Sequence, residues 1–83
     1  MAGPETGSEQ PPPAAVVILP DEIDMFSGPA AAAQLSAAIS AGPPVITADL
    51  TRTTFIDSSG AHLLYQAYRD AAAVGAQLRL ATA

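Results

Sequence analysis

Three strand-like runs alternate with two helical segments in this chain, and this order limits the possible folds more than any other feature. Residues 15–19 (AVVIL) and 45–50 (VITADL) are rich in β-branched residues, which is typical of strands buried on both faces. Residues 77–81 (QLRLA) alternate polar and apolar side chains, as a half-exposed strand does. Helical crossovers between strands favour a parallel sheet with right-handed connections. We therefore predict an α/β fold: a small, mainly parallel sheet in β-α-β-α-β order with helices packed on it.

Both helical segments carry start and stop signals. Ser27 can cap the first helix, Pro29 fits its first turn, and a Gly-Pro-Pro sequence follows its body at residues 30–41. The second helix is predicted over residues 59–73 and stops at Gly75. The helical period assigns the buried face of the first helix to Ala31, Leu35, Ala38 and Ile39. It assigns that of the second to Ala61, Leu64, Tyr68 and Ala71.

The N-terminal segment differs in composition from the rest. Residues 1–13 contain Pro, Gly, Ser, Thr and Glu and no large apolar residue except Met1, so we expect a disordered, Pro-rich tail. The domain is expected over residues 14–83. A chain of this size buries only roughly 60% of its unfolded surface, and much of its apolar content is alanine, so low stability is expected.

Charge and composition exclude several classes of function. The net charge is −5, lysine is absent, and only Arg52, Arg69 and Arg79 are basic, which argues against nucleic acid and anionic membranes as partners. Without cysteine there is no disulfide framework and no thiolate metal site. No apolar run reaches the roughly 20 residues that span a bilayer, and no signal peptide is evident, so a cytoplasmic location is expected.

The most informative stretch is Asp57-Ser58-Ser59-Gly60, directly before the second helix. One side chain can cap the helix, which leaves a hydroxyl free at the positive end of the helix dipole, where an added anion is stabilised. A simple N-cap is the alternative. This loop and the one that contains Asp24 both follow strands and precede helices. They are therefore expected to share the carboxyl edge of the sheet, where open α/β sheets place their sites.

Other candidate residues have simpler explanations. His62 invites a Ser-His hydrolase interpretation, but no acid orients it and the G-x-S-x-G elbow is absent, so a solvated helix-face histidine is preferred. The carboxylates of Asp21, Glu22 and Asp24 lie in too short a run for an EF-hand loop, so no metal or cofactor is predicted. Arg52 is interpreted as a solvated loop arginine rather than a phosphate ligand.

Four segments together resemble the STAS domain, the fold of bacterial anti-sigma factor antagonists, which regulate transcription and stress response. They are residues 21–24 (DEID), 49–51 (DLT), 55–60 (FIDSSG) and 75–80 (GAQLRL), and the resemblance covers residues 15–82. The resemblance implies a STAS-like fold in a truncated or minimal member, because relatives continue beyond the last strand. The family's turn glycine is Asp21 here, which fits if the backbone does not need a positive φ.

The resemblance also implies a function and a site. The first serine of the motif, Ser58, corresponds to the residue phosphorylated by an anti-sigma serine kinase, and Asp24 to a residue of the docking surface. Asp57 corresponds to the aspartate that holds the serine loop, and Ser59 and Gly60 complete the expected partner-binding surface. The implied activity is not enzymatic: the module binds the anti-sigma kinase when Ser58 is unmodified and releases it when phosphorylated, with a phosphatase left open as a further partner. A scaffolding module without phosphorylation and a ligand-sensing module are the alternatives.

Overall fold

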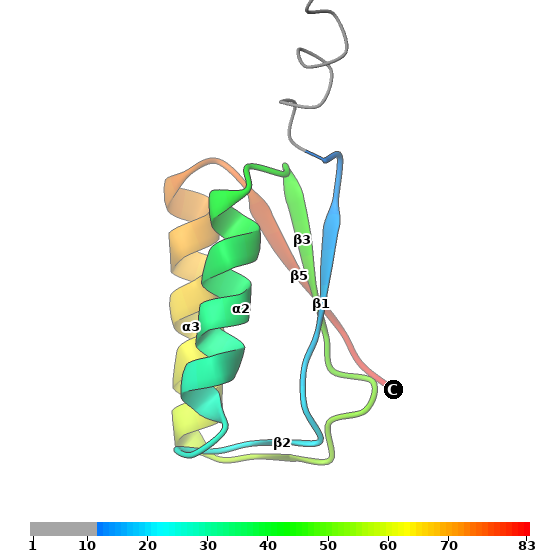
Figure 1. Cartoon of the computed structure of the whole chain (residues 1–83), viewed down its shortest axis with the longest axis vertical. Helices are drawn as coiled ribbons and strands as arrows, with labels where there is room; N and C mark the ends of the chain where they lie inside the picture. The colour runs from blue at the N-terminus through cyan, green and yellow to red at the C-terminus, as the bar shows by residue number, and fades with distance from the viewer. Residues whose placement is uncertain (1–11) are drawn as a thin grey trace, which may run out of the picture.

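The computed structural model describes residues 12–83, so all but the last two residues of the predicted tail at 1–13 lie outside the described part. A sheet of three parallel strands, in the order β1-β3-β5, forms one layer (Figure 1). Both helices cover the same face of this sheet and form the second layer. The elements are β1 (Ala15–Ile18), α2 (Gly28–Ser40), β3 (Val45–Asp49), α3 (Ser58–Ala73) and β5 (Gln77–Ala81). The predicted α/β class with parallel strands is confirmed.

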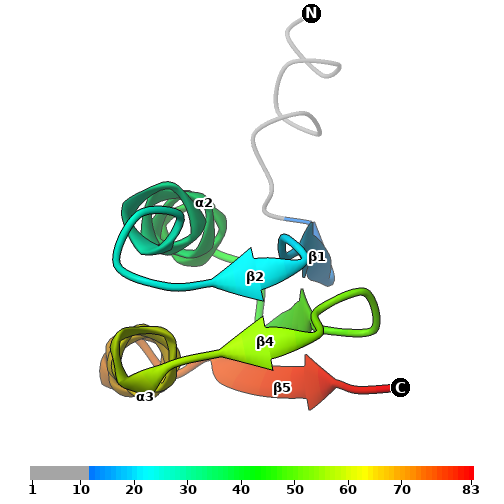
Figure 2. The ribbon, with the colours of Figure 1, turned by 90° about the horizontal axis from the view of Figure 1, so that it is seen from below.

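Two short strands that the sequence pattern did not predict form a second sheet. They are β2 (Glu22–Ile23), inside the predicted acidic turn, and β4 (Phe55–Ile56), inside the predicted loop before the second helix. They pair in parallel and lie side by side (Figure 2), below the ends of the main strands in the view of Figure 1. Two residues are too few for a periodic signal, which explains why the pattern missed them.

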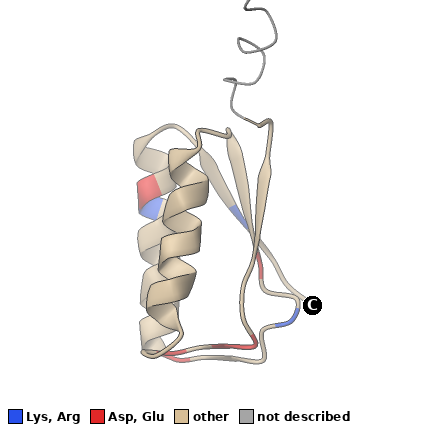
Figure 3. Ribbon diagram, viewed as in Figure 1, with Lys and Arg blue, Asp and Glu red and all other residues tan. Residues whose placement is uncertain are grey.

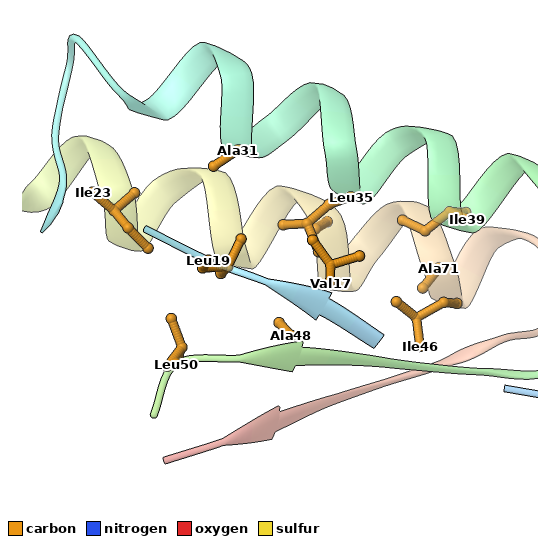
Figure 4. Close-up of a cluster of buried hydrophobic side chains, with 11 residues drawn as sticks. Val17, Leu19, Ile23, Ala31, Leu35, Ile39, Ile46, Ala48, Leu50 and Ala71 are labelled. Carbon is orange, nitrogen blue, oxygen red and sulfur yellow. The ribbon is translucent and has the colours of Figure 1, made fainter. Parts of the chain in front are cut away.

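The core lies between the helices and one face of the sheet (Figure 4). Its largest fully buried side chains include Leu19, Ile23, Leu35 and Ile46. The buried apolar residues are Val17, Leu19, Ile23, Ala31, Leu35, Ile39, Ile46, Ala48, Leu50, Ala67 and Ala71. Four of these eleven are alanines, in line with the expected small core.

The prediction that the first two strands are buried on both faces is wrong. In β1 only Val17 is buried, while Val16 is 65% and Ile18 54% exposed. In β3, Ile46 and Ala48 are buried, and Val45, Thr47 and Asp49 are half-buried. The physical reason is that both helices pack on the same side, which leaves the other face of the sheet uncovered among residues 12–83.

The buried face of α2 is confirmed, but that of α3 is partly wrong. Ala31, Leu35 and Ile39 are buried and Ala38 is half-buried against the core, as expected. In α3 the buried residues are Gly60, Ala67 and Ala71. Leu64 is half-buried against the core, whereas Ala61 and Tyr68 are exposed. Helix α3 packs against α2 as well as the sheet, so its buried stripe is rotated towards the small residues, which permit a close approach.

Two glycines end the helices, as predicted. Gly42 (φ 90°) and Gly75 (φ 78°) follow α2 and α3 in the left-handed region that other residues rarely enter. Among residues 12–83 no residue other than glycine has a positive φ. Asp21 therefore occupies the position of the family's turn glycine without backbone strain.

Candidate functional site

The loops after β1 and β3 meet at the carboxyl edge of the sheet, as the element order predicts. Strands β2 and β4 pair Glu22 with Phe55 and Ile23 with Ile56. Directly after this pair, the Asp57 amide donates a hydrogen bond to the Ile23 carbonyl over 3.2 Å. The segments that carry Asp24 and Ser58 are thus held together by backbone contacts. We call this edge, formed by residues 21–27 and 55–60, the rim.

Asp24 organises the turn that leads into α2. Its Oδ1 accepts hydrogen bonds from the amides of Phe26 and Ser27, both over 2.9 Å. In return, the Asp24 amide donates to Ser27 Oγ over 3.1 Å, and the Gly28 amide donates to the Asp24 carbonyl over 2.7 Å. These bonds form a reciprocal capping arrangement around the first turn. The hydrogen bonds, first those from the Ser27 and Phe26 amides, hold the pKa of Asp24 below its usual value.

The prediction that the Ser27 side chain caps the first helix is wrong. Ser27 occupies the N-cap position of α2, but its side chain accepts no hydrogen bond from the helix amides that follow. Its hydroxyl donates to the Glu22 carbonyl over 2.7 Å instead. The serine therefore ties the turn back to β2, and the carboxylate of Asp24 has the larger part in holding the helix start.

Asp57 is the N-cap of α3. Its Oδ1 accepts a hydrogen bond from the Gly60 amide over 3.0 Å. Ser58 and Ser59, in the first turn, are both exposed. Within residues 12–83 neither serine hydroxyl forms a hydrogen bond with another group. One side chain thus caps the helix, as expected, and both hydroxyls remain at the positive end of its dipole.

Gly60 lies beneath the rim rather than on its surface. It is buried, and a Cβ at this position would lie 2.6 Å from the Ile23 carbonyl oxygen and 2.7 Å from Ile56 Cγ2. No real Cβ fits at such distances, so a side chain here would push the first turn of α3 away from β2. The glycine therefore sets the spacing between Ser58 and the Asp24 turn.

The two serines of the motif differ in their surroundings. Ser59 lines a shallow depression of about 350 Å³ between the first turns of α2 and α3. Its other lining residues are Asp24, Met25, Gly28, Pro29, Ala32 and Leu63. Ser58 does not line it and lies one residue nearer the tip of α3.

Four large apolar side chains of the rim are exposed: Phe55 and Ile56 belong to the FIDSSG motif, and the sequence patterns indicate no role for the other two. Met25 is 67% and Phe26 86% exposed, and both follow Asp24 directly. Exposed large apolar residues are enriched at interaction sites when they gather in one place. The available signal was their position: two large apolar residues between a turn and a helix cap, in a chain that has only two Phe and two Met.

The rim carries negative charge (Figure 3). Asp21 and Glu22 are exposed, and Asp24 and Asp57 are half-buried beside them. Within the described part of the chain, no group of three His, Asp or Glu side chains is arranged to hold a metal ion. His62 is exposed and lines a groove between α2 and α3, and Asp70, about two turns further along α3, lines the same groove.

This fold and this rim define a class: small α/β modules that expose serine at the start of a helix beside an acidic turn. The family model of the STAS domain matches residues 7–83, and the chain therefore belongs to the STAS domain family. A search of curated proteins gave no match. Among the helices of residues 12–83, none is long and apolar enough to cross a membrane.

Proposed function

We propose that this STAS module is an anti-sigma factor antagonist whose binding is switched by phosphorylation of Ser58. In the unmodified form, the rim docks an anti-sigma kinase and displaces the sigma factor that the kinase holds. The observation that carries the proposal is the exposed Ser58 hydroxyl, which forms no hydrogen bond within residues 12–83 and lies at the start of α3, where Asp57 already supplies the cap. Membership of the STAS family supports it, because many such modules act by binding proteins.

The proposal assigns the chemistry to the partner. The γ-phosphoryl group of ATP is transferred to Ser58 Oγ, ADP leaves with the electrons of the broken bond, and the hydroxyl proton passes to a base of the kinase. This chain then supplies the acceptor and its presentation, and it acts as a binding module in the cytoplasm rather than as an enzyme. A phosphatase that hydrolyses the phosphoserine would restore the binding form.

Ser58 is preferred over Ser59 for a geometric reason. Ser59 lies against the depression between the helices, where a kinase has to approach past Met25 and Pro29. Ser58 is the first residue of the helix and lies outside that depression. An added phosphate at Ser58 therefore meets fewer neighbouring side chains.

Release follows from charge at the rim. A phosphoserine carries roughly −1.5 to −2 charges at neutral pH. The helix start offsets part of this, by about 0.3–1 kcal/mol at an exposed position. Asp57 and the Asp24 turn already make the surroundings negative. The uncompensated negative charge then lies on the surface that the anti-sigma kinase covers. The phosphorylated module therefore dissociates from the kinase without refolding.

The test is phosphate incorporation, measured by mass spectrometry after incubation with the cognate anti-sigma kinase and ATP. Wild type and Ser59→Ala should each gain one phosphate, and Ser58→Ala should gain none. Ser59→Ala is the matched control, because it removes a neighbouring hydroxyl from the same turn.

Two outcomes contradict the proposal. If Ser59→Ala abolishes incorporation and Ser58→Ala does not, the acceptor is Ser59. If wild type gains no phosphate but still binds the kinase, the module is a constitutive scaffold instead.

A further inference from the structure

The turn between β2 and α2 carries the most exposed large apolar side chain of residues 12–83. Phe26 is 86% exposed, and its neighbour Met25 is 67% exposed. Phe55 and Ile56, the other exposed apolar residues of the rim, belong to β4 and are exposed to a smaller extent. Single exposed apolar residues are common on protein surfaces, but adjacent ones at a candidate site indicate an interaction. We call these two residues the Met25–Phe26 pair.

Hydrogen bonds fix the backbone that carries the pair. The Phe26 amide donates to Asp24 Oδ1 over 2.9 Å, and the Ser27 hydroxyl donates to the Glu22 carbonyl over 2.7 Å. The turn is thus tied to β2 on one side and to the start of α2 on the other. A loop that is already ordered loses little conformational entropy on binding, so the side chains that it presents can contribute more fully to affinity.

The pair lies beside the serines of α3. Met25 and Ser59 line the same depression between the first turns of α2 and α3. The hydrogen bond from the Asp57 amide to the Ile23 carbonyl joins the two segments just before these turns. A protein that brings an active site to Ser58 therefore also approaches the Met25–Phe26 pair.

Charge around the pair indicates what covers it. The rim contains four acidic residues, Asp21, Glu22, Asp24 and Asp57, and neither lysine nor arginine (Figure 3). The rim of a second copy of this chain would bring the same negative charge against it, and an anionic membrane surface would be repelled as well. A protein surface with an apolar pocket and basic residues around that pocket matches both the apolar pair and the charge.

We propose that the Met25–Phe26 pair is the apolar anchor by which the rim binds the anti-sigma kinase, in a kinase pocket bordered by lysine or arginine. This inference rests on the proposed function, because it takes the kinase that phosphorylates Ser58 as the partner. Phenylalanine and methionine are enriched in the cores of interfaces, where a few buried residues supply most of the binding energy. The acidic side chains around the pair guide association and orient the two proteins.

The anchor and the phosphate acceptor have separate roles. Phe26 holds the kinase equally before and during phosphoryl transfer, so its loss should raise the KM of the kinase for this chain and leave kcat nearly unchanged. Salt distinguishes the anchor from the charges around it. Salt screens interactions between exposed charges, whereas apolar contacts are not screened, so the effect of losing Phe26 should persist at high salt.

Calorimetry with the full chain and the anti-sigma kinase, without ATP, tests the anchor. Phe26→Ala should raise the Kd at least about tenfold at low and at high salt, whereas Phe26→Leu, which keeps an apolar side chain, should stay within about threefold of wild type. Phe55→Ala, at the less exposed phenylalanine of the rim, should weaken binding less. Tyr68→Ala is the matched control, an exposed aromatic residue of α3 outside the rim, and should bind as wild type does. Circular dichroism checks that each variant is folded.

The outcomes separate the anchor from the switch. Wild-type affinity in Phe26→Ala, or a larger loss in Phe55→Ala, overturns the anchor even where Ser58 is phosphorylated. Weaker binding by Phe26→Ala supports the anchor even where wild type gains no phosphate, a result that refutes only the switch. A wild type that does not bind the kinase overturns both. If sedimentation shows a wild-type dimer that Phe26→Ala dissociates, with unchanged affinity for the kinase, the pair joins two copies and the proposal is wrong.

Discussion

At the scale of single residues, two aspartates do most of the positioning at the rim. Asp24 holds the turn before α2 through the amides of Phe26 and Ser27, and Asp57 holds the first turn of α3 through the Gly60 amide. Within the motif, the Asp57 side chain caps the start of α3, and the hydroxyls of Ser58 and Ser59 are not needed for capping. The alternative interpretation of the motif as a simple cap describes Asp57 correctly and leaves the serines unexplained.

Substitutions of Asp24 separate its structural part from its charge. Asp24→Ala removes the acceptor of both amide bonds and should lower the melting temperature. Asp24→Asn keeps an oxygen that accepts these bonds but not the charge that strengthens them, so it should melt between Asp24→Ala and wild type. If charge at the rim contributes to docking, both variants should bind the anti-sigma kinase with altered affinity by calorimetry. Wild-type affinity in both would remove Asp24 from the docking surface.

Gly60→Ala should destabilise the domain. The new Cβ would collide with the Ile23 carbonyl and the Ile56 side chain, and overpacking of this kind costs about 1–3 kcal/mol. Ser59→Ala, in the same helical turn but exposed, is the control and should change stability by at most about 0.5 kcal/mol. Urea denaturation measures both. Equal stabilities would mean that α3 does not approach β2 as closely as described.

At the scale of elements, apolar periodicity predicted the positions of the long helices and strands well, but it predicted less well which of their residues are buried. The face of α2 was identified because Leu35 and Ile39 are the only large apolar residues of this helix and lie one turn apart, which places Ala31 on the same face. In α3, apolar residues occur on more than one side, and Tyr68 looks like a core residue although it is exposed. The small Ala67, which is buried, carries little signal. Burial set by a neighbouring helix cannot be derived from the period of one segment.

Three substitutions test the element assignments together. Leu35→Ala should cost about 2–5 kcal/mol, because the side chain is fully buried. Leu64→Ala, at a half-buried position, should cost less, and Tyr68→Ala should stay within about 0.5 kcal/mol of wild type. Urea unfolding at low protein concentration gives the comparison. A larger loss at Tyr68 than at Leu35 would mean that the helix faces are assigned wrongly.

At the scale of the whole molecule, topology explains why the site could be located from the sequence. Parallel strands place the loops after β1 and β3 at one edge, so the rim followed from element order alone. The pairing of β2 with β4 could not be predicted in this way, because it depends on contacts between distant segments. The exposure of Phe26 could not be predicted either, because it depends on which surface remains uncovered. The uncovered sheet face was missed for the same reason.

Stability should fall in acid. Hydrogen bonds lower the pKa of Asp24, and those from the Thr51 hydroxyl and amide lower the pKa of Asp49. A carboxylate whose folded pKa is depressed stabilises the folded state above its unfolded value, near 3.9, and this contribution is lost as the pH falls through the folded pKa. Melting temperatures should therefore be level near neutral pH and decrease below about pH 4. Asp49→Asn, which keeps an acceptor for Thr51, should reduce the slope. A midpoint that rises on acidification would contradict this account.

Phosphate on Ser58 is proposed to reverse binding of the anti-sigma kinase, and calorimetry tests this switch most directly. The chain is phosphorylated, the modification is mapped to Ser58, and the unmodified and modified forms are titrated into the same anti-sigma kinase without ATP. The unmodified form should bind and the modified form should bind at least about tenfold more weakly, with both melting as folded domains. Equal or tighter binding by the phosphorylated form would contradict the switch.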